Sequence, residues 1–575
     1  MEKTCKTCNH QFEITDEDLA FYERISPVFG GKKYNITAPT LCHDCRQQRR
    51  LSFRNERNIY RRKSDLSGKE VVTMYAPESK CLVYDQNEWW GDSFDPLKYG
   101  KDFSFDKPFF EQFKELMMAV PRISLINKEP ENSEYCNFAF RNKDSYLLFT
   151  AWENDGCCYS NRIGKSRDTF DSSNVINCEL CYSAVDSENS YNCSFIKNCS
   201  NCTDCILGQN LRGCKNCFAS FGLANKQYCI GNIQYDKEEY ERRIKPFLEN
   251  LPKAKEDYFN WLKKIPRRYM EATNVENCTG DNIYNSKNAK ECYEVKELQD
   301  CKFVSNATSL KDCYDINNDD HSELVYECIG SEKNYMHIFN DICWFNSEIA
   351  YCSLCFNSKN CFGCIGLKKN EYCILNKQYT KEQYEELVPK IIEHMGGIGR
   401  AHGASAQVER ESGSASSSEA ELKENEWGEF FPMNISLFAY NESMAQDYFP
   451  MDKDNVKTRG LRWRDDEEET PKIGYKLPDF AKDAKEDICQ QILICESSGK
   501  AYKLLPKELN FYKKTNLPLP RKCPNQRHKE RMALRNQRKL YDRKCDKCGT
   551  PITTTYSPKQ PETVYCETCY LETVS

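Results

Sequence analysis

The chain contains 575 residues, with a formal net charge of −6 and 35 cysteines. Several domains are expected at this length, and the small net charge excludes a chain that is basic throughout. The odd cysteine count and the lack of an apolar export signal after Met1 argue against a secreted disulfide framework. No run of about 18 apolar residues predicts a membrane span. We therefore expect a cytoplasmic protein that uses its thiols for metal binding and packing.

Residues 1–65 are predicted to form a zinc module followed by a basic helix. Two CxxC pairs supply four thiolates, which complete the tetrahedral coordination of Zn²⁺ and leave no position for water. The expected ligands are Cys5, Cys8, Cys42 and Cys45. Arginines four residues apart form one stripe on a helix. The basic residues after the second pair are Arg46, Arg50, Arg54 and Arg57.

Residues 66–130 are interpreted as an aromatic and helical connector. The segment 108–118 has the amphipathic pattern of a helix, which is expected to end before Pro121. Beyond this point cysteines recur among Asn, Ser and Tyr at regular spacings, as in the pairs Cys193/Cys202, Cys217/Cys229 and Cys313/Cys328. Short, evenly spaced strand-like units of this kind predict a parallel β-solenoid.

A long internal repeat divides this region into two halves. Residues 216–235 match residues 360–379 in sequence. Each copy then enters a helix through a start that resembles a capping box, at Asp236 and at Thr380. We expect two solenoid halves, each closed by a helical cap. Their ranges are 131–270 and 271–395.

The 23 cysteines from Cys136 to Cys373 allow two interpretations. Buried cysteine behaves as a small apolar residue and can fill a narrow core. Tight groups such as Cys199/Cys202/Cys205 could instead bind metal, and the region would then be an irregular string of metal knuckles. We favour the core interpretation, because CxxC spacing also follows from the turns of a solenoid.

The C-terminal third begins with a Gly/Ser-rich linker at 396–425 and a partly folded connector at 426–486. Within this connector, the acidic run 465–469 is expected to be a solvated turn. Residues 487–544 are a degenerate copy of the first zinc module, in which two of the four ligands are replaced. The four positions are Cys495, Ser498, Cys523 and Gln526. Two thiolates make a poor structural zinc site, so we expect this copy to be metal-free.

The basic frame after the degenerate copy repeats that of the first module. Its arginines are Arg527, Arg531, Arg535 and Arg538. Residues 545–575 then form a zinc finger in which two CxxC pairs are separated by seventeen residues. This spacing predicts a second structural zinc site. The ligands are Cys545, Cys548, Cys566 and Cys569.

These motifs resemble known families. Residues 1–50 resemble the bacterial probable zinc-ribbon family of treble-clef type, with a degenerate copy at 495–531. The C-terminal tail resembles a family of small CxxC-x17-CxxC zinc fingers. The whole chain is similar to large cysteine-rich proteins of small-genome bacteria. The resemblance implies zinc binding and carries no activity.

The expected architecture is a multidomain α+β protein in which terminal zinc-ribbon modules flank a cysteine-rich solenoid. Arginine stripes with few acids suit phosphate contacts. The first hypothesis is therefore a non-enzymatic zinc protein that binds RNA or a ribonucleoprotein. The alternative is a protein–protein scaffold that uses the solenoid surface. A third hypothesis, an enzyme using Asp319 and Asp320, lacks a recognised catalytic motif; no small-molecule substrate is evident and no membrane contact is expected.

Overall fold

The computed structural model describes residues 1–397, 425–465, 474–478 and 481–574. Most of the predicted linker 396–425 and nearly all of the acidic run 465–469 lie outside these ranges. The protein has a mixed α/β fold with two large parallel sheets, and its chain divides into two compact units. The first unit contains Met1–Ser124, Met270–Arg464 and Arg538–Leu540, and the second contains Leu125–Tyr269, Asp465–Gln537 and Tyr541–Ser575.

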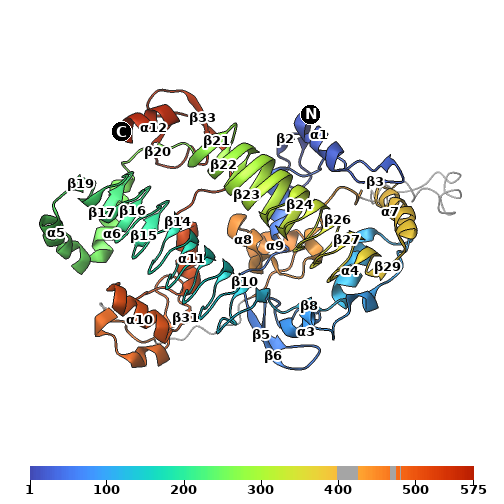
Figure 1. Ribbon diagram of the computed structural model, residues 1–575, viewed down its shortest axis with the longest axis horizontal. Helices are drawn as coiled ribbons and strands as arrows, with labels where there is room; N and C mark the ends of the chain where they lie inside the picture. Colours follow the sequence, from blue (N-terminus) through green and yellow to red (C-terminus); the bar gives the residue numbers. More distant parts are fainter. Residues whose placement is uncertain (398–424, 466–473, 479–480, 575) are drawn as a thin grey trace. The chain divides into compact units, whose positions relative to one another are not determined.

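The second unit is built on an eleven-stranded sheet (Figure 1). Its strands are β9 (Asn127–Lys128), β10 (Asn137–Phe140), β11 (Phe149–Trp152), β12 (Asn161–Gly164), β13 (Ser173–Ile176), β14 (Val185–Glu188), β15 (Ser194–Lys197), β16 (Ile206–Gln209), β17 (Lys215–Phe221), β18 (Gln227–Ile230) and β19 (Ile233–Gln234). Between β10 and β18, successive strands pair in parallel with an offset of twelve residues, as Asn137 does with Phe149. Strand β19 ends the sheet by pairing antiparallel with β18.

The first unit contains a nine-stranded sheet of the same kind. Its strands are β21 (Ala272–Glu276), β22 (Gly280–Lys290), β23 (Cys292–Asp320), β24 (Glu323–Glu332), β25 (Tyr335–Ile338), β26 (Ser347–Ala350), β27 (Lys359–Phe362), β28 (Glu371–Ile374) and β29 (Lys377–Gln378). Cys361 pairs with Cys373 in this sheet, and their counterparts in the internal repeat, Cys217 and Cys229, pair with each other in the second unit. The internal sequence repeat therefore has the same strand pairing in both units.

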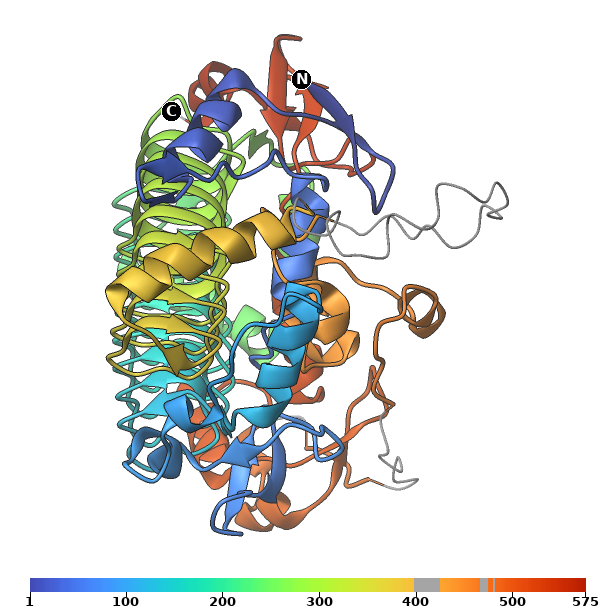
Figure 2. The ribbon, with the colours of Figure 1, turned by 90° about the vertical axis from the view of Figure 1, so that its right-hand side faces the viewer.

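Each sheet is followed by a helix. Helix α7 (Lys381–Met395) begins with a capping box at Thr380, which confirms the predicted start, and packs against β28 (Figure 2). In the second unit α5 (Lys237–Glu249) follows β19, with Asp236 as its N-cap, and α6 (Leu251–Leu262) follows α5. The helix predicted at 108–118 is confirmed as α4 (Phe109–Ala119).

The remaining elements are short and belong mainly to the cysteine modules. In the first unit they are β1 (Glu2–Thr4), β2 (Gln11–Glu13), α1 (Asp16–Ile25), β3 (Val28–Phe29), β4 (Lys32–Lys33), α2 (His43–Leu51), β5 (Tyr60–Lys63), β6 (Glu70–Thr73), β7 (Val83–Tyr84), α3 (Gln86–Trp90), β8 (Arg122–Ile123), α8 (Met444–Tyr448) and α9 (Lys453–Thr458). In the second unit they are β20 (Arg267–Arg268), β30 (Leu493–Ile494), β31 (Ala501–Tyr502), α10 (Pro506–Thr515), α11 (Pro524–Met532), β32 (Tyr541–Lys544), β33 (Pro551–Thr554), β34 (Val564–Tyr565) and α12 (Glu567–Val574).

The abundance of Asn has a backbone cause. Along most of both sheets every third residue has a left-handed φ, for example Asn174 (56°), Asn177 (53°) and Leu180 (55°). Asn tolerates this region better than most residues, because its short polar side chain bonds locally. Some of these side chains also bond between successive repeats, as Asn198 does when it donates to Asn210 at 3.0 Å.

The cysteines of the repeat regions are core residues, except the half-buried Cys278. A buried column with twelve-residue spacing contains Cys181, Cys193, Cys205, Cys217 and Cys229. Their thiols are close to main-chain carbonyls; Cys181 Sγ, for example, is 3.4 Å from the Ser190 oxygen. Within the described ranges, only the two terminal cysteine sets bring three or more His, Cys, Asp or Glu ligand atoms close enough to share one metal ion. The core interpretation is thus favoured over the string of metal knuckles.

Candidate metal centres and arginine helices

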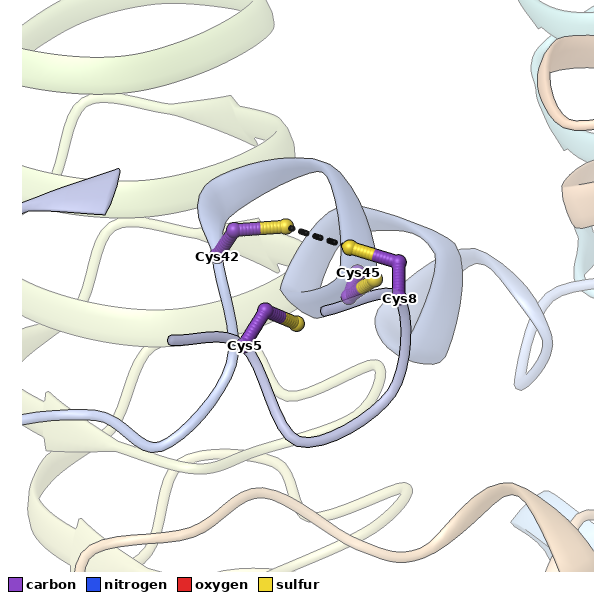
Figure 3. A group of neighbouring side chains, drawn as sticks. All are labelled: Cys5, Cys8, Cys42 and Cys45. Carbon is purple, nitrogen blue, oxygen red and sulfur yellow. Dashed lines mark hydrogen bonds between the residues drawn. The ribbon is translucent and has the colours of Figure 1, made fainter. Parts of the chain in front are cut away.

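The first cysteine set lies where a loop meets a helix (Figure 3). Cys5 and Cys8 flank the turn between β1 and β2, Cys42 is the N-cap of α2, and Cys45 is in its first turn. The four sulfur atoms lie within 4.8 Å of one another, and Cys8 Sγ is 3.7 Å from Cys42 Sγ. Tetrahedral Zn–S bonds of about 2.3 Å place sulfurs about 3.8 Å apart, so the set fits a zinc ion.

The second cysteine set has the same plan. Cys545 and Cys548 flank the turn between β32 and β33, and Cys566 and Cys569 lie at the start of α12. The Cys548 and Cys566 sulfurs are 3.7 Å apart, and all four atoms lie within 4.8 Å of one another. Thiolate is the ligand form. Burial acts to raise the pKa of Cys545, but hydrogen bonds from backbone N–H groups, including that of Cys566, lower it to about 6.

The degenerate copy keeps part of this geometry with only two of the four cysteine ligands. Cys523 is the N-cap of α11, as Cys42 is of α2. Ser498 Oγ lies 3.7 Å from Cys523 Sγ, the same separation as in the first set. The site therefore lacks two thiolates, but the backbone still places the positions of residues 498 and 523 as in the first set.

The double substitution Ser498→Cys/Gln526→Cys is expected to add one zinc ion per chain. The two new thiolates would complete a four-sulfur site with Cys495 and Cys523 in a fold that is already formed. Zinc content measured by mass spectrometry after gel filtration tests this, with Ser498→Cys alone as the control. An unchanged zinc content in the double variant would contradict the expected geometry.

The arginine stripe of the first module is buried. Arg46 and Arg50 are 2% and 0% exposed, and both pair with the Asp315 carboxylate, at 2.9 and 3.1 Å. Arg49 pairs with Glu327 at 3.0 Å. Burial acts to raise the pKa of Asp315, but Arg46 and Arg50 hold it below its usual value, whereas burial raises the pKa of Glu327.

The second stripe repeats the arrangement. Arg527 and Arg531 both pair with Asp171, and Arg527 also pairs with Glu508 at 3.0 Å. Asp171 and Asp315 are separated by the offset of the internal repeat. Both arginine helices therefore dock on equivalent aspartates of the two sheets.

Aromatic rings dock in the same pattern. Phe21 stacks on Tyr314 at 3.9 Å, and Phe511 stacks on Phe170 at 4.2 Å. Tyr314 and Phe170 are again separated by the offset of the internal repeat. Each unit thus combines one sheet with one copy of the first module, held by equivalent contacts.

The other predicted nucleic-acid contacts are placed similarly. Arg54 is buried and pairs with Glu56 at 2.6 Å, and Arg538 pairs with Glu294 at 2.8 Å. Arg535 is half-buried and pairs with Asp186, and Arg57 is half-buried. Phosphate binding needs guanidinium groups that are accessible. The predicted contacts therefore gain no support from this geometry, because at least seven of the eight arginines are neutralised by carboxylates of their own unit.

Sequence reasoning missed these acceptors. Asp171 and Asp315 occupy equivalent positions of the repeat, and this offset was the available signal. Of the two carboxylates proposed for catalysis, Asp319 is buried and accepts from Ser322 at 2.8 Å, and burial raises its pKa well above the usual range. Asp320 is exposed. These positions neither support nor contradict a catalytic role for the two carboxylates.

The chain matches none of the family models and none of the curated proteins with which it was compared. In the described part of the chain, no helix is both long and apolar enough to cross a bilayer.

Proposed function

We propose that the protein is a non-enzymatic, zinc-binding scaffold for other proteins. In this proposal each parallel sheet belongs to a β-solenoid, and zinc-ribbon modules of treble-clef type dock on it. The two terminal cysteine sets would each hold one structural Zn²⁺. Such sites stabilise small modules that have little core of their own.

The observation that carries the scaffold interpretation is the burial of the arginine stripes. Arg46, Arg50, Arg527 and Arg531 are each at most 7% exposed and paired with Asp315 or Asp171. Buried ion pairs of this kind hold elements together and present no charge to a polyanion. The RNA-binding hypothesis relied on these residues and is therefore the weaker proposal.

The test uses the full-length protein purified from the cells that naturally produce it. We expect two zinc ions per chain, together with protein partners that remain bound after nuclease treatment and in high salt. Phosphate-dominated binding falls steeply with salt, so the two hypotheses separate clearly. Loss of all partners on nuclease treatment would reject the scaffold function in favour of RNA binding.

A further inference from the structure

The second unit contains an open cavity of about 470 Å³ next to its arginine helix α11. Its walls include Phe195 from the sheet, Lys255 from α6, Leu534 just after α11, and Tyr556 from the C-terminal module. This volume lies within the range of ligand-binding pockets. None of the functions considered above uses the cavity.

The first unit has equivalent positions for this cavity. The two modules align through their cysteine motifs and basic frames, so that Leu534 corresponds to Phe53 and Tyr556 to Tyr75. Helix α6 corresponds to α4, because equivalent strands follow them. Strand β20 follows α6 and pairs in parallel with β34, and β8 follows α4 and pairs in parallel with β7.

In the first unit these positions are covered by a segment of the same chain, residues 425–438. Phe431 stacks on Phe113 of α4 with ring centroids 4.5 Å apart, and Phe430 meets Phe53 at 5.5 Å. Phe430 and Phe431 are 1% exposed. The aromatic pair therefore fills the space beside the arginine helix.

Further contacts extend along the same segment. Phe438 stacks on Tyr75 at 5.3 Å, and Glu429 pairs with Arg49 at 2.7 Å. Ser436 Oγ donates to the Ser52 carbonyl at 2.7 Å. The segment thus contacts several of the positions whose counterparts line the open cavity.

No described segment of the second unit takes this place. The counterparts Tyr258, Leu534 and Tyr556, for Phe113, Phe53 and Tyr75, all line the cavity. These aromatic and apolar positions suit a large ring, while other parts of the wall are charged, for example at Lys197 and Arg267. The cavity is therefore lined by the counterparts of the residues that hold the segment 425–438 in the first unit.

The charges of the two grooves differ. Lys255 stands where α4 has Phe110, and its Nζ lies 4.2 Å from the Phe195 ring centroid. Within the described residues no carboxylate lies within ion-pair distance of Lys255, and burial lowers its pKa. Glu530 stands where the first unit has Arg49, and it forms an exposed ion pair with Lys522 at 2.6 Å. A basic residue in the place of Glu429 would therefore suit this groove better than the glutamate of the segment 425–438.

We propose that this cavity binds an extended aromatic peptide segment of a partner protein. A large ring would take the place that Phe431 has in the first unit, and a carboxylate of the partner would meet Lys255. This inference rests on the proposed scaffold function and names the chemistry of its partner.

The probe is a fluorescent peptide with the sequence of residues 425–438, titrated into the full-length protein. We expect saturable binding with a dissociation constant below about 100 μM, weakened about tenfold or more by Phe430→Ala/Phe431→Ala in the peptide. The peptide with Glu429→Lys is expected to bind more tightly, because its lysine would meet Glu530 and not Arg49. The protein variant Lys255→Glu should weaken both peptides, and Lys253→Glu, an exposed site on the same helix, should not.

Each other outcome overturns the inference. Binding that ignores Lys255→Glu would mean that the peptide exchanges into the first unit. Binding of neither peptide, together with saturable binding of inorganic phosphate, would make the cavity an anion site. Zinc content and nuclease-resistant partners are measured separately, so loss of the peptide site leaves the scaffold function standing and loss of the scaffold function is recognised by itself.

Discussion

Replacement of Asp315 by alanine is expected to lower the free energy of unfolding of the first unit by about 3–5 kcal/mol. The substitution removes the carboxylate nearest to Arg46 and Arg50, at 2.9 and 3.1 Å. These buried guanidinium groups would keep only the more distant Glu327, at 3.8 and 3.6 Å. Removal of one partner of a buried pair costs far more than the net contribution of the pair, since the remaining charge stays desolvated. Urea unfolding of the full-length protein, monitored by hydrogen exchange in α2, measures the change in unfolding free energy.

The matched control is Glu323→Ala on the same sheet. Glu323 pairs with Lys311 at 2.8 Å, but the two side chains are 44% and 49% exposed. Exposed pairs contribute at most about 1 kcal/mol, so this variant should be nearly as stable as the parent. Equal effects of the two substitutions would show that the arginine helix is not held by Asp315.

Replacement of Cys545 by serine is expected to remove one of two zinc ions and to unfold the C-terminal module. The module has a small core, in which Cys545 and Cys569 pack with Ile552 and Val564. Without metal such a core cannot offset the entropy of ordering the chain, because binding and folding free energy are the same quantity in small zinc modules. Zinc content by mass spectrometry and hydrogen exchange over residues 541–574 test both parts of this result.

Cys489→Ser is the control for the loss of a thiol. Cys489 is half-buried and belongs to neither cysteine set. The Cys489→Ser variant should keep two zinc ions and full protection of the C-terminal module against hydrogen exchange. Retention of two zinc ions by the Cys545→Ser variant would show that this cysteine set does not hold a metal in the protein.

The cysteine sets could be predicted from sequence because their ligands lie in short local motifs. A CxxC turn brings two thiols together through local backbone geometry, and the sequence of residues 545–569 contains both such turns. The repeat was visible for a related reason. A twelve-residue register places the same residue types at the same positions, and the left-handed backbone at every third residue selects Asn and Asp.

The role of the arginines was not predictable in the same way. A stripe such as Arg46, Arg50 and Arg54 looks the same in sequence whether it faces phosphate or a buried carboxylate. The partner Asp315 lies in a distant part of the chain, and only the docking of α2 on β23 brings it to Arg50.

The sequence by itself determined the cysteine sets, the repeat and the loss of ligands at Ser498 and Gln526, since each is a property of neighbouring or periodic residues. The tertiary structure decided which charges are buried and which groove is filled. Burial depends on what packs against a surface. Phe430 and Phe431 come from a distant part of the chain to pack against Phe53 and Phe113. The physical reason is that desolvation belongs to the assembled unit and not to the helix on which a charge or ring resides.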